Sequence, residues 1–148
     1  MILSDIGFHE ASTLEQAAEL MARCGAHARF LAGGTSLVVD LKTDRYQADH
    51  VISLNRIASL RGISAADKGV RIGALATLNE VATSELIRDK CPVIREAARE
   101  MASPQVRNLG TVGGNIVGAV PCADLPPVMA VTYSTVNLHL PESVHCFP

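Results

Sequence analysis

The segment ASPQVRNLGTVGGNI, residues 102–116, is the most informative part of this 148-residue chain. Its second half holds a diglycine, Gly113-Gly114, between Thr111 and Asn115. A similar segment, AGGTS, occupies residues 32–36. Because glycine has no Cβ, it accepts positive φ and lets backbone N–H groups approach an anion closely. Either segment alone is more often a tight corner, but the two together favour a phosphate-bearing ligand.

The residues beside each diglycine add hydroxyl and amide groups that suit phosphate oxygens. Thr35 and Ser36 follow the first diglycine, and Thr111 precedes the second. The sequence therefore predicts two loops that bind a pyrophosphate from both sides through backbone amides, with no need for Lys or Arg. Neither Gly-x-Gly-x-x-Gly nor the Gly-x-x-x-x-Gly-Lys-Ser/Thr phosphate loop is present, which disfavours a Rossmann domain or a P-loop nucleotidase.

The first third of the chain has the pattern of a small α/β unit. Ser12 and Glu15 have the spacing of a capping box, which predicts a helix that Gly25 ends. Strands are expected at residues 29–31 and 50–54, with a short helix from Leu37. Residues 2–8 could form an edge strand or an extended arm.

The pattern changes in the middle of the chain. Two strands at residues 61–64 and 69–73 are expected around a polar turn. Thr77 and Glu80 form a second capping box, with a helix to about Ile87, and Pro92 begins another helix that Ser103-Pro104 ends. The last strand is expected within residues 131–140. A boundary near residues 55–60 predicts two subdomains, residues 1–58 and 59–148.

Composition excludes several classes of protein. The chain is 48% hydrophobic with a net charge of −2 and scattered basic residues, which argues against nucleic acid as a partner. No apolar run is long enough to cross a membrane. The four cysteines lack Cys-x-x-Cys spacing and the five histidines lack ligand spacing, so no metal site is expected and the thiols suit the reducing cytoplasm.

Three segments in this order resemble one family. They are FLAGGTSL at residues 30–37, VRIGA at residues 70–74, and the segment 102–116 followed by PCADLPP at residues 121–127. The family is the FAD-binding subunit or domain of molybdopterin-dependent hydroxylases, the group of xanthine dehydrogenase, carbon monoxide dehydrogenase and aldehyde oxidoreductase.

The resemblance implies an α+β fold with two subdomains, the FAD-binding fold of the vanillyl-alcohol-oxidase (PCMH) type. A small α/β unit precedes an antiparallel-sheet α+β unit, and FAD lies between them. It also implies FAD contacts from both diglycine segments, from a carboxylate that accepts from FAD hydroxyls, and from two apolar side chains. These residues are Ala32, Gly33, Gly34, Thr35, Ser36, Leu37, Met101, Thr111, Val112, Gly113, Gly114, Asn115 and Asp124. No catalytic acid, base or nucleophile is expected.

The function implied by the resemblance is electron transfer in an oxidoreductase. The flavin subunit takes electrons from [2Fe–2S] clusters on a small partner subunit and passes them to an acceptor such as NAD. A large molybdopterin-containing subunit oxidises the substrate. The resemblance leaves self-association open.

Two other interpretations remain beside this one. The tail, residues 132–148, does not resemble the family's continuation, so the chain is expected to be a truncated member that lacks the C-terminal part of the fold. It would then be a non-catalytic domain without functional FAD. The other alternative is a flavoenzyme similar to UDP-sugar reductases. The segments at residues 105–108 and 124–127 fit this alternative poorly.

Overall fold

The computed structural model describes residues 5–67, 69–118, 123–140 and 143–147. The chain divides into two compact units. Unit 1 contains Met1–Ser59 and Val136–Phe147, and unit 2 contains Leu60–Thr135. The division into functional subdomains at residues 1–58 and 59–148 stays a prediction.

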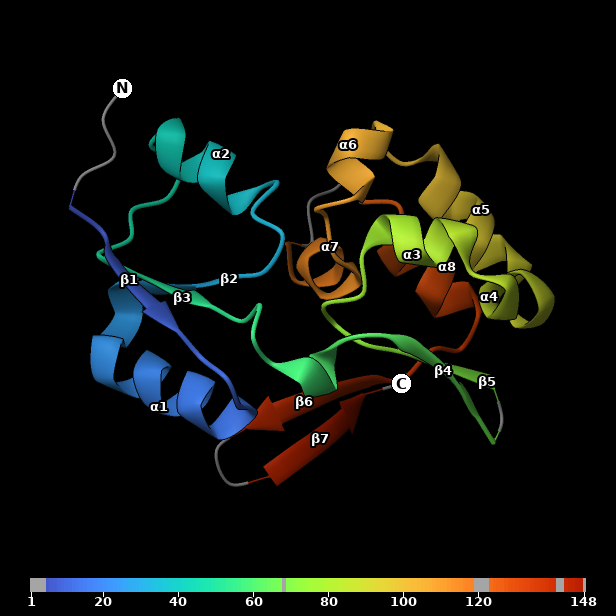
Figure 1. Ribbon diagram of the computed structural model, residues 1–148, viewed down its shortest axis with the longest axis horizontal. Helices are drawn as coiled ribbons and strands as arrows, with labels where there is room; N and C mark the ends of the chain where they lie inside the picture. The colour runs from blue at the N-terminus through green and yellow to red at the C-terminus, as the bar shows by residue number, and fades with distance from the viewer. Residues whose placement is uncertain (1–4, 68, 119–122, 141–142, 148) are drawn as a thin grey trace. The chain divides into compact units, whose positions relative to one another are not determined.

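A three-stranded parallel sheet forms the centre of unit 1 (Figure 1). The strand order is β1-β3-β2, with β1 at Gly7–Glu10, β2 at Ala28–Leu31 and β3 at His50–Ser53. The short helix η1 (Gly25–His27) precedes β2. Helices α1 (Leu14–Cys24) and α2 (Leu37–Lys42) lie on opposite faces of the sheet (Figure 1). This alternation of strands and helices is the small α/β unit that the sequence predicts.

The start of α1 differs from the prediction by one residue. Thr13, and not Ser12, is the N-cap, and its hydroxyl accepts a hydrogen bond from the Gln16 N–H at 3.1 Å. The Gln16 side chain in turn accepts from the Ser12 N–H at 2.8 Å. The predicted Ser12–Glu15 box is therefore wrong, because the neighbouring Thr13–Gln16 pair satisfies the first N–H groups. Gly25 ends the helix as predicted, at φ 75°.

The C-terminal residues of unit 1 form an antiparallel hairpin of β6 (Val136–Leu140) and β7 (Ser143–Phe147). The strand predicted at residues 131–140 is correct only from Val136, since α8 (Leu125–Val131) includes the first of those residues. Pro126 and Pro127 lie in the first turn of α8, where a missing N–H costs no hydrogen bond. The apolar run after them continues that helix.

Unit 2 combines an antiparallel hairpin with packed helices. The hairpin is β4 (Ile63–Ala66) and β5 (Gly69–Ile72), after the short helix η2 (Ala58–Leu60). The helices are α3 (Leu78–Thr83), α4 (Glu85–Lys90), α5 (Pro92–Glu100), α6 (Pro104–Arg107), α7 (Val112–Gly118) and α8. Their buried side chains make one apolar core: Leu78, Val81, Ala82, Ile87, Ile94, Ala98, Met101, Val112 and Leu125.

Local caps set most of these helix boundaries. The Thr77–Glu80 capping box is confirmed, but the helix it opens ends at Thr83 and not at Ile87. Ser84 leaves the helical conformation and accepts from the Ile87 N–H, which begins α4. Ser103 likewise caps α6 and does not end α5, which stops at Glu100.

Among the described residues, the helices are all too short or too polar to span a bilayer.

Candidate functional site

The first diglycine segment, residues 32–36, connects β2 to α2 at the carboxyl edge of the parallel sheet. Gly34 has φ +74°, in the left-handed region that favours glycine. A Cβ on Gly34 would lie 3.3 Å from side-chain atoms of Leu31 and Val38. This turn therefore depends on glycine at position 34.

The backbone of the first diglycine segment has used acceptors and unused donors. The Ala32 carbonyl accepts from the Asn55 side chain at 3.1 Å, and the Gly34 and Ser36 carbonyls accept from α2. In the described part of the chain, no hydrogen bond engages the N–H groups of residues 33–36. Successive unpaired N–H groups at a strand-to-helix turn can bind an anion, and ligands of parallel sheets bind beyond the carboxyl ends of strands.

The second diglycine segment, residues 111–115, is mostly helical and not a loop as predicted. Gly113 and Gly114 lie in the first turn of α7. The Val112 N–H donates to the Ala76 carbonyl at 2.9 Å, and the Gly113 N–H donates to the Ala74 carbonyl at 2.8 Å. The Gly114 and Asn115 N–H groups donate to Thr111 at 3.1 and 3.0 Å. The expectation that these amides are free to bind phosphate is therefore wrong.

Close packing explains the glycine at position 113. A Cβ there would lie 2.8 Å from the Ala74 carbonyl oxygen and 2.9 Å from the Ala74 Cβ. Thr77 and Thr111 also form an antiparallel bridge beside this contact. The absence of a side chain thus lets α7 begin directly against residues 74–77, and this packing uses the N–H groups that a ligand would need.

In the second diglycine segment, the Asn115 side chain has a polar atom without a hydrogen-bond partner among the described residues. Its Oδ1 is buried and accepts no hydrogen bond from the described residues. A buried acceptor without a donor costs about 1–3 kcal/mol. Asn115 therefore has a physical reason to meet a hydrogen-bond donor that the described residues do not supply.

Arg107 stabilises the turn before α6. Its Nη1 donates to the carbonyls of Met101 and Ala102, both at 2.9 Å. Ala102 has φ 47°, which is unusual for a residue with a Cβ. Because Met101 is the C-cap of α5, Arg107 acts as a cap at the end of that helix.

The remaining predicted site residues differ in exposure. Leu37 packs against the apolar cluster of unit 1, and Met101 is buried in the core of unit 2. Asp124 is exposed beside the first turn of α8 and makes no capping hydrogen bond. Packing thus accounts for Leu37 and Met101, whereas the Asp124 carboxylate is available to a ligand.

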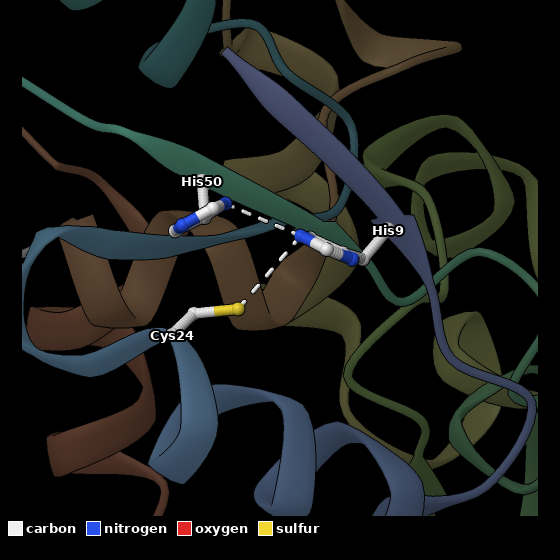
Figure 2. A group of neighbouring side chains, drawn as sticks. All are labelled: His9, Cys24 and His50. Atoms are coloured by element: carbon white, nitrogen blue, oxygen red, sulfur yellow. Dashed lines mark hydrogen bonds between the residues drawn. The ribbon is translucent and has the colours of Figure 1, made fainter.

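Three residues that the sequence did not single out as a group lie together in unit 1. They are His9, Cys24 and His50, whose side chains converge in Figure 2. The expectation that no metal ligands are grouped rested on spacing along the chain. Cys24 is 15 positions from His9, and His50 is 41 positions from His9, so spacing alone does not reveal the group.

Comparison with known proteins gives consistent matches. The profile of the family described as "FAD binding domain in molybdopterin dehydrogenase" matches residues 4–148. The chain is 38% identical over 126 residues to the carbon monoxide dehydrogenase medium chain of Hydrogenophaga pseudoflava, covering 85% of this chain and 44% of that one. It is 33% identical over 144 residues to the xanthine dehydrogenase FAD-binding subunit of Escherichia coli O157:H7, covering 95% and 48%.

A solved structure matches the fold over nearly the whole chain. It is the Hydrogenophaga pseudoflava carbon monoxide dehydrogenase that lacks the Mo-pyranopterin moiety of its cofactor. The TM-score is 0.96 at 34% sequence identity, and the match covers 99% of this chain and 51% of that chain.

The chain belongs to the family of FAD-binding domains of molybdopterin dehydrogenases. The α+β FAD-binding fold and FAD as the cofactor are thereby confirmed. The chain spans about half the length of the relatives it matches. The expectation that the resemblance ends near Thr132 is wrong, because the family match includes residues 132–148.

Proposed function

We propose that this chain is the flavin-binding part of an electron-transfer oxidoreductase, and that the first diglycine segment binds the pyrophosphate of FAD. The observation that carries the proposal is the run of unpaired N–H groups at residues 33–36. Hydrogen bonds to a charged group contribute about 1.5–3 kcal/mol each, so a few of these donors suffice without a basic side chain. The hydroxyls of Thr35 and Ser36 add further donors.

In unit 2 we assign the polar contacts to side chains. The Oδ1 of the half-buried Asn115 accepts from a ligand donor, and the exposed Asp124 carboxylate accepts from FAD hydroxyls. The other predicted residues of this unit stay in the proposed contact set as packing surface: Met101, Thr111, Val112, Gly113 and Gly114. Ala32 and Leu37 have the same role in unit 1.

The names of the relatives support a proposal about partner subunits. They include a carbon monoxide dehydrogenase medium chain and a xanthine dehydrogenase FAD-binding subunit. We propose that a molybdopterin-containing large subunit and a [2Fe–2S] small subunit are the partners here, that NAD accepts the electrons, and that the complex works in the cytoplasm. Bound FAD supplies the redox chemistry, and the chain's residues bind and orient it.

The direct test is FAD uptake by the purified chain. We expect one FAD per chain after removal of free flavin, and reduction by dithionite followed by reoxidation by an acceptor. A chain that folds and takes up no FAD would contradict the proposal. Uptake of FAD that cannot be reduced and reoxidised would instead support a non-catalytic domain.

A further inference from the structure

One cluster of metal-binding side chain types lies in unit 1 and has no part in the proposed function. His9 lies on β1, His50 is the first residue of β3, and Cys24 is the last residue of α1 (Figure 2). His9 Nε2 lies 3.3 Å from His50 Nδ1, and Cys24 Sγ lies 3.7 Å from His9 Nε2. The three donor atoms are all within 4.8 Å of one another.

Two of these three separations match those between ligands of one tetrahedral metal ion, and the third, between Cys24 and His50, lies within 4.8 Å. With Zn–N near 2.0–2.1 Å and Zn–S near 2.3 Å, two nitrogen ligands lie about 3.3 Å apart, and a nitrogen and a sulfur about 3.6 Å apart. The two contacts of this cluster, at 3.3 and 3.7 Å, match both edges. Without a metal, the same atoms are at hydrogen-bonding distance from each other.

The parallel sheet brings the two histidines to one face. In the register of β1 and β3, Gly7 is opposite His50, and His9 is opposite Ile52. Residues two positions apart on a strand share a face, so His9 and His50 both point to the side that α1 covers. The end of α1 then adds Cys24 to the pair (Figure 2).

Gly7 provides the space that His50 needs for this contact. A Cβ on Gly7 would lie 2.5 Å from His50 Nδ1 and 3.1 Å from its Cε1. Gly7 does not have positive φ, so its backbone conformation does not require glycine. The absence of a side chain at Gly7 therefore leaves room for the imidazole nitrogen of His50 that faces His9.

We propose that His9, Cys24 and His50 bind one divalent transition-metal ion of the Zn²⁺ class. Two imidazoles and a thiolate suit a borderline-soft ion and not Mg²⁺ or Ca²⁺, which prefer oxygen ligands. The three residues are only partly buried, which leaves the fourth coordination position to water. The bound ion joins β1, α1 and β3, so it stabilises unit 1 independently of FAD.

The test uses Co²⁺ as a spectroscopic probe on the flavin-free, chelator-treated chain. We expect one Co²⁺ per chain with tetrahedral d–d bands and a thiolate-to-cobalt charge-transfer band, and displacement of Co²⁺ by Zn²⁺. Absence of the charge-transfer band in the wild-type chain, or no saturable binding, would overturn the proposal whatever the variants do.

Variants locate the ion. Cys24→Ser abolishes the charge-transfer band. His50→Asn weakens Zn²⁺ binding more than about ten-fold, because removal of a residue that only hydrogen-bonds to a metal ligand already weakens metal binding by at least that factor. Cys91→Ser and His27→Asn are the matched controls, because Cys91 lies in unit 2 and His27 is exposed outside the cluster. Equal Co²⁺ spectra for Cys24→Ser and the wild-type chain would overturn the assignment.

Gly7→Ala tests the geometry while it keeps all three ligands. The added methyl group displaces the His50 ring, so we expect at least about ten-fold weaker Zn²⁺ binding. The Zn²⁺-dependent rise in melting temperature of the wild-type chain is lost in Cys24→Ser and reduced in Gly7→Ala. Unchanged Zn²⁺ affinity in a folded Gly7→Ala chain would contradict the geometry.

Discussion

The first diglycine segment, residues 32–36, and the second, residues 111–115, place similar residues in two different backbone settings. In the first, the carbonyls of Ala32, Gly34 and Ser36 accept hydrogen bonds, and the N–H groups of residues 33–36 have no partner among the described residues. In the second, the N–H groups from Val112 to Asn115 all donate within unit 2. The first segment can therefore offer its backbone to an anion, whereas the second uses its backbone to attach a helix.

The difference shows that a diglycine can have two unrelated causes. Gly34 is required by its φ of +74°, which is a property of its own backbone. Gly113 is required by the neighbouring Ala74, which would collide with a Cβ. Substitutions should separate these causes into effects on ligand binding and effects on stability.

Gly113→Val should have the largest effect, and the effect should be on stability. The new side chain would overlap the backbone of Ala74, and overpacking of this kind costs about 1–3 kcal/mol. Urea unfolding of the flavin-free chain measures the loss. Gly118→Val at the end of the same helix is the control, because a Cβ there meets no atom within 4 Å. Equal stability of the two variants would contradict the packing account.

Asn115→Leu should separate stability from FAD binding. It removes the buried Oδ1 that accepts no hydrogen bond, so the free energy of unfolding of the flavin-free chain should stay equal or rise by about 1 kcal/mol. FAD should bind about ten-fold more weakly, which corresponds to about 1.4 kcal/mol. Fluorescence titration with FAD measures this, with Asn79→Leu on α3 as the control. Unchanged FAD affinity would remove Asn115 from the proposed site.

Ser36→Ala should have the smallest effect. Ser36 is exposed and does not cap α2, so stability should change by less than about 0.5 kcal/mol. Loss of one hydroxyl should weaken FAD binding by about 1 kcal/mol, or about five-fold. Thr13→Ala should do the reverse, because its hydroxyl caps α1: about 1 kcal/mol of stability lost and FAD affinity kept. The same response in both variants would show that the hydroxyl of Ser36 acts only on the fold.

Local patterns predicted the features that depend on neighbouring residues. The Thr77–Glu80 capping box and the helix from Pro92 need only a few adjacent side chains, and the structure contains both. The first diglycine turn also follows from its own backbone at Gly34. The family resemblance supplied FAD, which no local pattern could name.

Contacts between distant residues explain what the sequence did not predict. The N–H of Gly113 is used by Ala74, 39 positions earlier, and spacing within a glycine-rich run carries no sign of it. His9 and His50 meet only because β1 and β3 are neighbours in a parallel sheet. The sequence predicts a strand from His50, but His9 lies just beyond residues 2–8, for which the sequence allows an edge strand or an extended arm, and the strand order is not predicted.

The most direct test compares FAD binding by Gly34→Ala and Gly25→Ala. Both glycines have φ near +75°, at +74° and +75°, but only Gly34 lies in the first diglycine segment. An alanine at such a positive φ is strained at either position, at a cost of about 1–3 kcal/mol of stability. We predict that Gly34→Ala loses at least about ten-fold in FAD affinity while Gly25→Ala binds FAD like the wild-type chain. Equal FAD affinity in both variants and the wild-type chain would contradict the assignment of the pyrophosphate to residues 32–36.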